Sequence, residues 1–216
     1  MKVLIVTGGN VDIPFAKDYL ADQKFDRVIA ADSGLSHCER LSLLPTDILG
    51  DFDSLKERDL PEQFEKKGAH IRVFPKKKDD TDTQLAVKLA LEWKPREIVF
   101  LGATGTRYDH TLANISLLEG LCREGIVGKI VDSHNEIMML QGSTEKIFTK
   151  KEDLPFFSLV SWGGEVKGID LEGFAYPLQN GTLSTSTSLG ISNEITGERG
   201  ILRVRSGYLL VIRSRD

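Results

Sequence analysis

The first 132 residues alternate between short apolar runs and amphipathic stretches, and this alternation constrains the fold most strongly. The candidate strands are residues 2–7, 27–31, 47–50, 70–73, 97–101 and 129–132. The clearest helices are residues 83–93 and 109–124, where apolar side chains recur at helical spacing behind acidic or hydroxyl residues. Strands that alternate with helices predict a Rossmann-like α/β architecture, with a mostly parallel sheet and helices on both of its faces.

The pattern changes after about residue 133, where no long helical period remains. Short strand-like runs occur at residues 156–161, 201–204 and 208–213, with frequent glycines between them. We also interpret the Ser/Thr-rich residues 182–188 as a strand lined by hydroxyl groups. Such a pattern is typical of an antiparallel β-sandwich. The sequence therefore predicts an α/β domain over residues 1–133, followed by an all-β domain over residues 134–216.

Composition and charge exclude several classes of function. The 216 residues carry a formal net charge of −4, so a broad basic surface for nucleic acid is not expected. No apolar stretch approaches the ~20 residues of a membrane-spanning helix, and no export signal precedes the first strand. Cys38 and Cys122 have neither CxxC spacing nor companion cysteines, which predicts free thiols and a reducing, cytoplasmic location.

Acidic and glycine-rich segments follow four consecutive predicted strands. They are residues 32–34, 50–54, 76–82 and 102–109. In an open parallel sheet, ligands bind at the carboxyl ends of the strands, where these loops converge. The sequence therefore predicts a ligand site at one edge of the first domain.

Asp51 and Asp53 are the simplest candidates for metal ligands. Two carboxylates at positions i and i+2 of an extended segment project to the same side and can reach one cation. Magnesium prefers oxygen ligands and bridges one or two carboxylates to substrate phosphates. The alternative is a solvated acidic turn, because Asp is a common turn residue.

A denser acidic cluster, Asp79-Asp80-Thr81-Asp82, follows Lys76, Lys77 and Lys78. Neighbouring carboxylates and lysines could hold magnesium and a triphosphate together. The alternative is a helix N-terminus beginning at Thr81 or Asp82, where Asp and Thr cap free amides. Both interpretations can hold at once, since helix amides also attract an anion.

The third segment runs from Gly102 to His110. Its glycines allow backbone amides to approach a phosphate, Arg107 offers a planar cation, and Asp109 can cap the next helix or accept from a ribose or base. It is neither a Walker A loop nor a dinucleotide-binding fingerprint. The alternative is an ordinary strand-to-helix turn. The chain's histidines, His37, His70, His110 and His134, show no metal-ligand spacing, and only His110 adjoins the predicted site.

An ordered set of motifs resembles the thiamine pyrophosphokinase family. These are ADSG at residues 31–34, PTDILGDFDS at 45–54, KDDTD at 78–82, GATGTRYDH at 102–110 and SLGISNE at 188–194. The resemblance spans nearly the whole chain. It implies a homodimeric enzyme with an α/β nucleotide domain and a β domain, which transfers pyrophosphate from ATP to the hydroxyethyl group of thiamine and releases AMP.

The resemblance also implies roles for individual residues. Magnesium would be held by Asp51, Asp53 and Asp82, with Asp79 close by. Our own hypothesis is that Asp79 accepts the hydroxyl proton, and these four residues form the predicted catalytic set. ATP would contact Asp32, Lys78, Gly102, Thr104, Arg107 and Asp109. Thiamine would contact Tyr176, Ser186, Ser192 and Asn193. Tyr176 stands where animal members of the family have a tryptophan.

Two other functions remain open at this point. Asp-x-Asp pairs also hold the metal of nucleotide-sugar donors, so another magnesium-dependent, nucleotide-using transferase is one alternative. The other is a non-catalytic nucleotide-binding module whose β domain serves only for dimerisation. For the thiamine-dependent enzyme, we expect thiamine to lie between the α/β domain of one subunit and the β domain of its partner.

Overall fold

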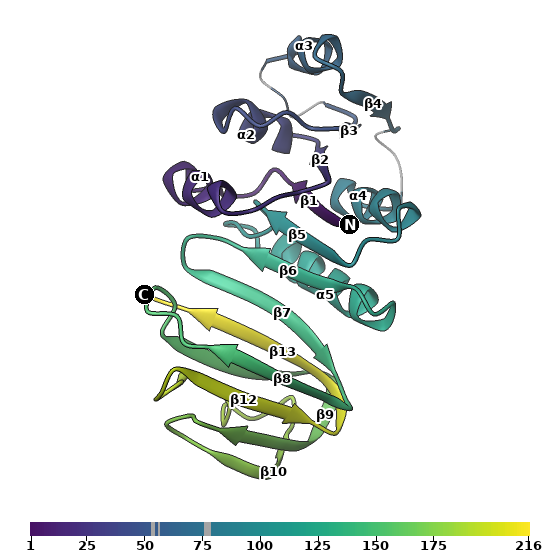
Figure 1. The fold of residues 1–216 in the computed structure, drawn as a ribbon. Coiled ribbons are helices and arrows are strands. Elements are labelled where there is room, and N and C mark those ends of the chain that lie inside the picture. Colours follow the sequence, from purple (N-terminus) through teal and green to yellow (C-terminus); the bar gives the residue numbers. More distant parts are fainter. Residues whose placement is uncertain (53–54, 56, 76–78) are drawn as a thin grey trace. The chain divides into compact units, whose positions relative to one another are not determined.

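The protein is described from a computed structural model that covers residues 1–52, 55, 57–75 and 79–216. The chain forms two compact units. Unit 1 contains Met1–Leu117 and Gly125–Ser133, and unit 2 contains Leu118–Glu124 and His134–Asp216. The chain passes from unit 1 into unit 2 within its longest helix and again after Ser133 (Figure 1).

Unit 1 is built on a parallel sheet. Its strands are β1 (Lys2–Val6), β2 (Arg27–Ala31), β3 (Asp47–Gly50), β4 (His70–Val73), β5 (Glu97–Leu101) and β6 (Val127–Val131). They lie in the order β4-β3-β2-β1-β5-β6, and every neighbouring pair is parallel. The direction of strand addition reverses between β1 and β5. In such sheets this reversal is the point where a crevice opens at the carboxyl ends of the strands.

The helices between these strands begin at recognisable caps. They are α1 (Ile13–Ala21), α2 (Gly34–Arg40), α3 (Leu60–Lys66), α4 (Asp82–Glu92) and α5 (Tyr108–Arg123). The carboxylate of Asp12 accepts a hydrogen bond from the amide of Phe15 at 2.8 Å, which fixes the start of α1. The hydroxyl of Thr81 does the same for Gln84 at 3.2 Å, so α4 begins at Asp82, as the sequence predicts.

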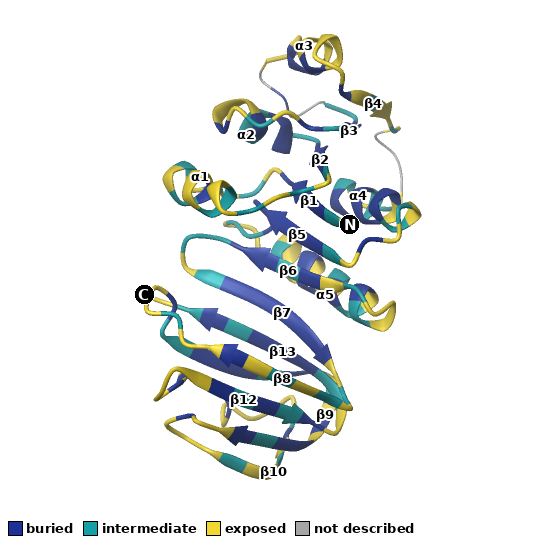
Figure 2. Ribbon diagram, viewed as in Figure 1, coloured by how far each residue is buried: buried dark blue, intermediate teal, exposed yellow. Residues whose placement is uncertain are grey.

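Both faces of the central strands of the parallel sheet are buried, whereas the edge strand β4 is largely exposed. Leu4 and Val6 of β1 belong to a cluster that includes Leu35 of α2. Val3 and Ile5 are equally buried, and side chains alternate along a strand, so these two face the opposite side, where α4 contacts β1. Figure 1 shows α1 and α2 on one face and α4 and α5 on the other, and Figure 2 shows the strands between them as buried. Each fully buried aliphatic side chain contributes about 1.5–3 kcal/mol to folding.

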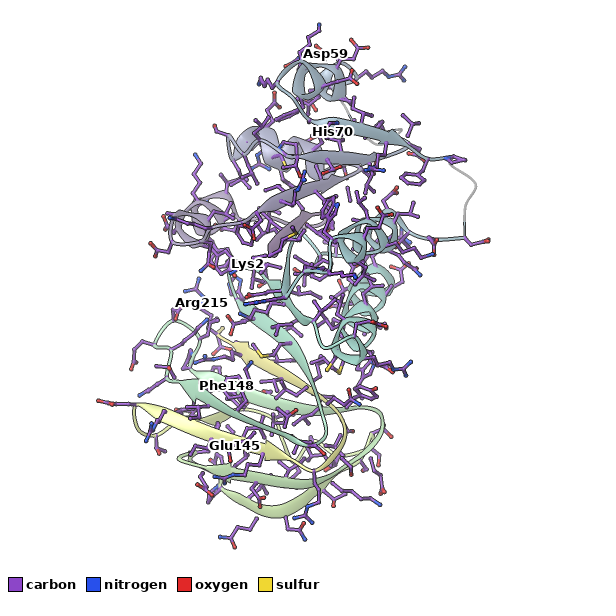
Figure 3. All side chains as sticks on the ribbon, turned by 45° about the vertical axis from the view of Figure 1, so that its right-hand side comes forward. Lys2, Asp59, His70, Glu145, Phe148 and Arg215 are labelled. Atoms are coloured by element: carbon purple, nitrogen blue, oxygen red, sulfur yellow. The ribbon has the colours of Figure 1, made fainter. Side chains whose placement is uncertain are left out.

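Unit 2 is antiparallel. Its strands are β7 (Asn135–Gln141), β8 (Thr144–Thr149), β9 (Phe156–Glu172), β10 (Leu178–Leu183), β11 (Asn193–Glu194), β12 (Arg199–Val204) and β13 (Ser206–Ser214). The first half of β9 pairs with β13, and its second half pairs with β10 and β12. Phe157 from the first half and Leu171 from the second half share one core cluster, so the two halves enclose a common interior. Phe148 of β8, labelled in Figure 3, belongs to the same core, whereas Glu145 of the same strand pairs with Arg203 at the surface.

The predicted fold class is confirmed: a parallel α/β sheet is followed by antiparallel β-strands. The prediction of a strand over residues 182–188 is wrong, because β10 ends at Leu183. Beyond it, the hydroxyls of Ser184 and Ser186 lie 3.3 Å apart, and that of Thr187 accepts from the amide of Leu189. Serine and threonine hydroxyls that bond to the local backbone favour turns over strands.

Both cysteines are free thiols. Cys38 on α2 is fully buried, and burial raises the pKa of its thiol to about 12. Cys122 is partly buried, and burial also raises the pKa of its thiol. Among the helices that the structure describes, none is long and apolar enough to cross a membrane.

Candidate active site

A cavity of about 490 Å³ opens at the carboxyl ends of the parallel strands, and all of its lining residues belong to unit 1. The lining comes from the loops after β1, β2, β3 and β5 and from the N-terminal ends of α4 and α5. It includes residues 7–10, 31–33, 51, 80–83, 102–107, 110, 111 and 114. A cavity of this volume at the topological reversal of an α/β sheet suits a small-molecule ligand.

The loops after β1 and β5 are joined by hydrogen bonds. The amide of Gly9 donates to the carbonyl oxygen of Gly102 at 2.8 Å, and the amide of Asn10 donates to that of Thr104 at 2.8 Å. The hydroxyl of Thr7 also donates to the carbonyl of Gly102. Carbonyl oxygens of the β5 loop are therefore engaged by the neighbouring loop, which reduces their repulsion toward an anionic ligand.

Glycine is required where these loops meet. A Cβ atom on Gly9 would lie 2.3 Å from the carbonyl oxygens of both Gly102 and Thr104. Gly102 itself has a φ of +70°, and a Cβ there would lie 2.3 Å from the carbonyl oxygen of Thr7. The two backbones thus approach more closely than any other residue type would allow.

Two further side chains fix the β5 loop. The buried amide of Asn114, on α5, donates to the carbonyl oxygen of Ala103 at 2.8 Å. The hydroxyl of Thr104 donates to a carboxylate oxygen of Asp132 at 2.8 Å. Thr104 is one of the predicted ATP contacts, and Asp132, directly after β6, therefore orients its hydroxyl.

Three of the predicted carboxylates line the cavity from separate loops: Asp32 after β2, Asp51 after β3 and Asp82 at the start of α4. Carboxylate oxygens are the donors that magnesium prefers, so the chemistry of these side chains suits that ion. The predicted ligand Asp53 and the predicted ATP contact Lys78 lie outside the described residues. Within the described part of the chain, no three His, Cys, Asp or Glu side chains form a metal-binding group.

Strained backbone accompanies two of these acidic loops. Asp32 and Phe52 have φ values of 48° and 58°, in the left-handed region that side chains other than glycine rarely adopt. A Cβ on Gly50 would lie 3.0 Å from the Cα of Asp32, so glycine permits the end of β3 to approach that residue. Backbone strain of this kind costs about 1–3 kcal/mol per residue and concentrates at functional sites.

The structure separates Asp79 from Asp80. Asp80 lines the cavity, and its carboxylate pairs with the ammonium group of Lys88 at 2.6 Å. Asp79, the predicted proton acceptor, is exposed and is not among the lining residues.

Arg107 lines the cavity and forms an ion pair with Asp109 at 2.6 Å. Both side chains are exposed, at 69% and 65%. The hydrogen bonds from Arg107 and from the amide of His110 hold the pKa of the Asp109 carboxyl below its ordinary value. Asp109 itself is not among the lining residues, so its direct geometric link to the cavity is Arg107.

In unit 2, three of the predicted thiamine contacts lie together. The buried side chain of Asn193 accepts from the amide of Tyr176 at 3.0 Å and donates to its carbonyl oxygen at 2.8 Å. Ser192 precedes it with a φ of 56°, and its amide donates to the hydroxyl of Ser158. Tyr176 is 71% exposed. Ser186 is exposed on the turn after β10, where its hydroxyl lies beside that of Ser184.

Sequence reasoning missed the loop after β1 and the side chain of Asn114. The dipeptide Gly8-Gly9 directly after the first predicted strand was the available signal, because the rule applied to the other four loops applies equally to this one. Asn114 gave no signal, since an isolated Asn within a helical pattern is uninformative. Only the packing of α5 against the β5 loop identifies it.

Comparisons with known proteins place the chain in a family. Residues 19–127 match the family described as "Thiamin pyrophosphokinase, catalytic domain". Residues 144–209 match "Thiamin pyrophosphokinase, vitamin B1 binding domain". The first match contains Asp32, Asp51, Asp82 and the β5 loop, and the second contains Tyr176 and Asn193.

The relatives extend over nearly the whole chain. The thiamine pyrophosphokinase of Bacillus subtilis is 34% identical over 188 residues, which cover 87% of each protein. The crystal structure of the Bacillus subtilis enzyme has a TM-score of 0.90, with 31% identity and complete coverage of both chains. A thiamin pyrophosphokinase family protein from Enterococcus faecalis has a TM-score of 0.84, with 30% identity and the same coverage. The chain therefore belongs to the thiamin pyrophosphokinase family.

Proposed function

We propose that this protein transfers the terminal pyrophosphoryl group of ATP to the hydroxyl of thiamine, giving thiamine diphosphate and AMP. The observation that carries the proposal is the cavity where the β1 and β5 loops meet, lined by carboxylates from separate loops. Its glycine-rich backbone suits a polyphosphate, and its carboxylates suit the metal that accompanies one. The vitamin B1 binding domain of the family matches unit 2 of the same chain.

The reaction forms one bond and breaks one. The oxygen of the thiamine hydroxyl attacks the β-phosphorus of ATP, and the bond between that phosphorus and the oxygen bridging to the α-phosphorus breaks. AMP leaves with the bridging oxygen, and the hydroxyl proton passes to a carboxylate. Asp79 stays the predicted acceptor of this proton. Alignment and charge neutralisation supply most of the catalysis in phosphoryl transfer.

We assign the magnesium ligands to Asp51, Asp53 and Asp82. When bound, magnesium neutralises the polyphosphate and fixes its orientation. Arg107 would contact the same phosphates, and its ion pair with Asp109 holds the guanidinium at the cavity. Asp32, Lys78, Gly102 and Thr104 complete the proposed ATP contacts.

Thiamine would contact the segment around Tyr176, Ser192 and Asn193, with Ser186 as the fourth predicted contact. Its cationic ring is attracted by the carboxylates and by bound polyphosphate. We propose a homodimer in which this segment serves the cavity of the partner subunit, because the two sets of contacts belong to different units. A cytoplasmic location is also proposed, and the two free thiols support it.

The proposal predicts AMP formation that requires both thiamine and magnesium. AMP should appear when the protein is incubated with ATP, Mg²⁺ and thiamine, and the signal should vanish after chelation and return when Mg²⁺ is restored. Sugar acceptors in place of thiamine provide the control for the nucleotide-sugar alternative. AMP formation that does not depend on thiamine would refute the proposal, and so would the absence of AMP formation under all these conditions.

Asn193→Asp should weaken the use of thiamine while leaving the affinity for ATP unchanged. A carboxylate can still accept from the amide of Tyr176, but it cannot donate to the carbonyl oxygen that Asn193 now contacts at 2.8 Å. The loss of one buried hydrogen bond, about 1–3 kcal/mol, should displace Tyr176 and raise the KM for thiamine about fivefold or more. Steady-state kinetics with each substrate varied in turn would measure this.

The matched control for this prediction is Gln179→Glu, which makes the same amide-to-carboxylate change at an exposed position of β10. It should leave both KM values unchanged. If Asn193→Asp behaved like this control, Asn193 would not position Tyr176.

A further inference from the structure

His37 contacts the cavity's glycine-rich loop from outside the cavity lining. It lies on α2, and its imidazole Nε2 is 2.8 Å from the carbonyl oxygen of Gly9. Since a carbonyl oxygen can only accept, Nε2 carries the proton in this contact and donates it. The hydrogen bond joins residues 28 positions apart in the sequence. The histidine pattern gave no indication of this contact.

This contact completes a connection across three loops. The amide of Gly9 already donates to Gly102, and the next amide, that of Asn10, donates to Thr104. His37 holds the remaining polar group of the Gly9 residue, its carbonyl oxygen. The helix that carries His37 begins directly after Asp32 and Ser33, which line the cavity. The loops after β1, β2 and β5 are therefore fixed to one another around Gly9.

The environment of the ring favours its neutral form. Burial, together with the nearby charge of Arg40, lowers the pKa of His37, although the hydrogen bond to Gly9 opposes this effect. The second ring nitrogen, Nδ1, is buried and has no hydrogen-bond partner among the residues that the structure describes. The bond from Nε2 to Gly9 is therefore the hydrogen bond by which this ring acts on the loop.

We propose that His37 is a positioning residue for nucleotide binding: by holding the carbonyl oxygen of Gly9, it keeps the β1 loop in the conformation that shapes the ATP cavity. A carbonyl released from this bond could turn toward the cavity, where it would repel polyphosphate. This inference rests on the proposed function, because it takes ATP as the ligand of the cavity.

Two substitutions separate the hydrogen bond from the mere volume of the ring. His37→Leu removes the donor, whereas His37→Gln retains an N–H donor near the position of Nε2. We expect His37→Leu to weaken binding of ATP with Mg²⁺ about five- to tenfold, the equivalent of one lost hydrogen bond. His37→Gln should stay within about twofold of the unchanged protein, since its hydrogen bond is kept.

The readouts are the Kd for ATP by titration calorimetry in Mg²⁺ buffer, the KM for thiamine at saturating ATP, and the Tm. His70→Leu, on the exposed strand β4 (Figure 3), makes the same chemical change away from the cavity and should alter no affinity. The inference holds if His37→Leu weakens ATP binding, leaves the KM for thiamine unchanged, and is rescued by His37→Gln.

Three results would overturn it. The first is an unchanged Kd in His37→Leu, and the second is equal losses in His37→Leu and His37→Gln. The third is a parallel loss for ATP and thiamine that follows the Tm, which would indicate a purely structural role. Absence of thiamine-dependent AMP formation in the unchanged protein would refute the proposed function instead, and the ATP titration would still decide the role of His37.

Discussion

Asp82→Asn should lower kcat for thiamine-dependent AMP formation by about 10²- to 10³-fold, the range for loss of one preorganised electrostatic group. Asp82, the first residue of α4, lines the same cavity as Asp32 and Asp51. Asparagine keeps the size of the side chain but removes the charge that holds magnesium. Asp51→Asn should have a similar effect. In the Asp51→Asn/Asp82→Asn double variant, the loss of transition-state stabilisation should be smaller than the sum of the two single losses, because both residues are proposed to hold one ion.

The fall in kcat should not come from unfolding. Asparagine is nearly isosteric with aspartate, and losing a negative charge in the first turn of α4 costs only about 0.3–1 kcal/mol, so the Tm of Asp82→Asn should fall only slightly. Asp18→Asn, on the exposed surface of α1, is the matched control and should change neither kcat nor Tm. Full activity in both Asp82→Asn and Asp51→Asn would show that these carboxylates do not hold a catalytic metal in this cavity.

Gly9→Ala should both destabilise the protein and abolish tight ATP binding. The added Cβ would lie 2.3 Å from two backbone oxygens, those of Gly102 and Thr104, and backbone cannot move aside as a flexible side chain can. Overpacking of this kind costs about 1–3 kcal/mol of stability. The β1 and β5 loops must also separate, which disrupts the cavity that they form. Chemical denaturation and ATP titration would measure the two effects.

Gly120→Ala provides the opposite control within the same chain. Gly120 is exposed on α5, and a Cβ there meets no atom within 4 Å among the described residues. Alanine in a helix is more stable than glycine by about 0.5–1 kcal/mol, so this variant should be slightly more stable and fully active. If Gly9→Ala were as harmless as Gly120→Ala, the two loops could not be as close as the structure places them.

Local sequence patterns were sufficient for most strands of unit 1 and for the helices α4 and α5. The predicted strands at residues 27–31, 47–50, 70–73 and 97–101 coincide with β2, β3, β4 and β5. For β2, β3 and β5 this agreement has a physical cause, since strands buried on both faces are continuous apolar runs. The cap at Thr81 was equally local, because its hydroxyl bonds to an amide three residues away. The Ser/Thr-rich turn after Leu183 was mistaken for a strand, because serine and threonine occur both in strands and in turns.

The site was only partly accessible to the same reasoning. The rule that ligands bind at strand ends identified Asp32, Asp51, Asp82 and the β5 loop, all of which line the cavity. The rule could not tell which of the neighbours Asp79 and Asp80 lines the cavity, because that depends on the exact path of the backbone before α4. Asn193 was expected to contact thiamine. In the structure its side-chain amide forms hydrogen bonds with the backbone N–H and C=O of Tyr176.

The sequence by itself determined the two classes of secondary structure, the chemistry of the strand-end loops and the family. Only the tertiary structure decided which loops meet. Because β1 lies next to β5 in the sheet, Gly9 reaches Gly102, and because α2 packs beside β1, His37 reaches Gly9. Contacts between residues so distant in the chain depend on strand order and on the close approach of two backbones, and neither leaves a periodic signal in the sequence.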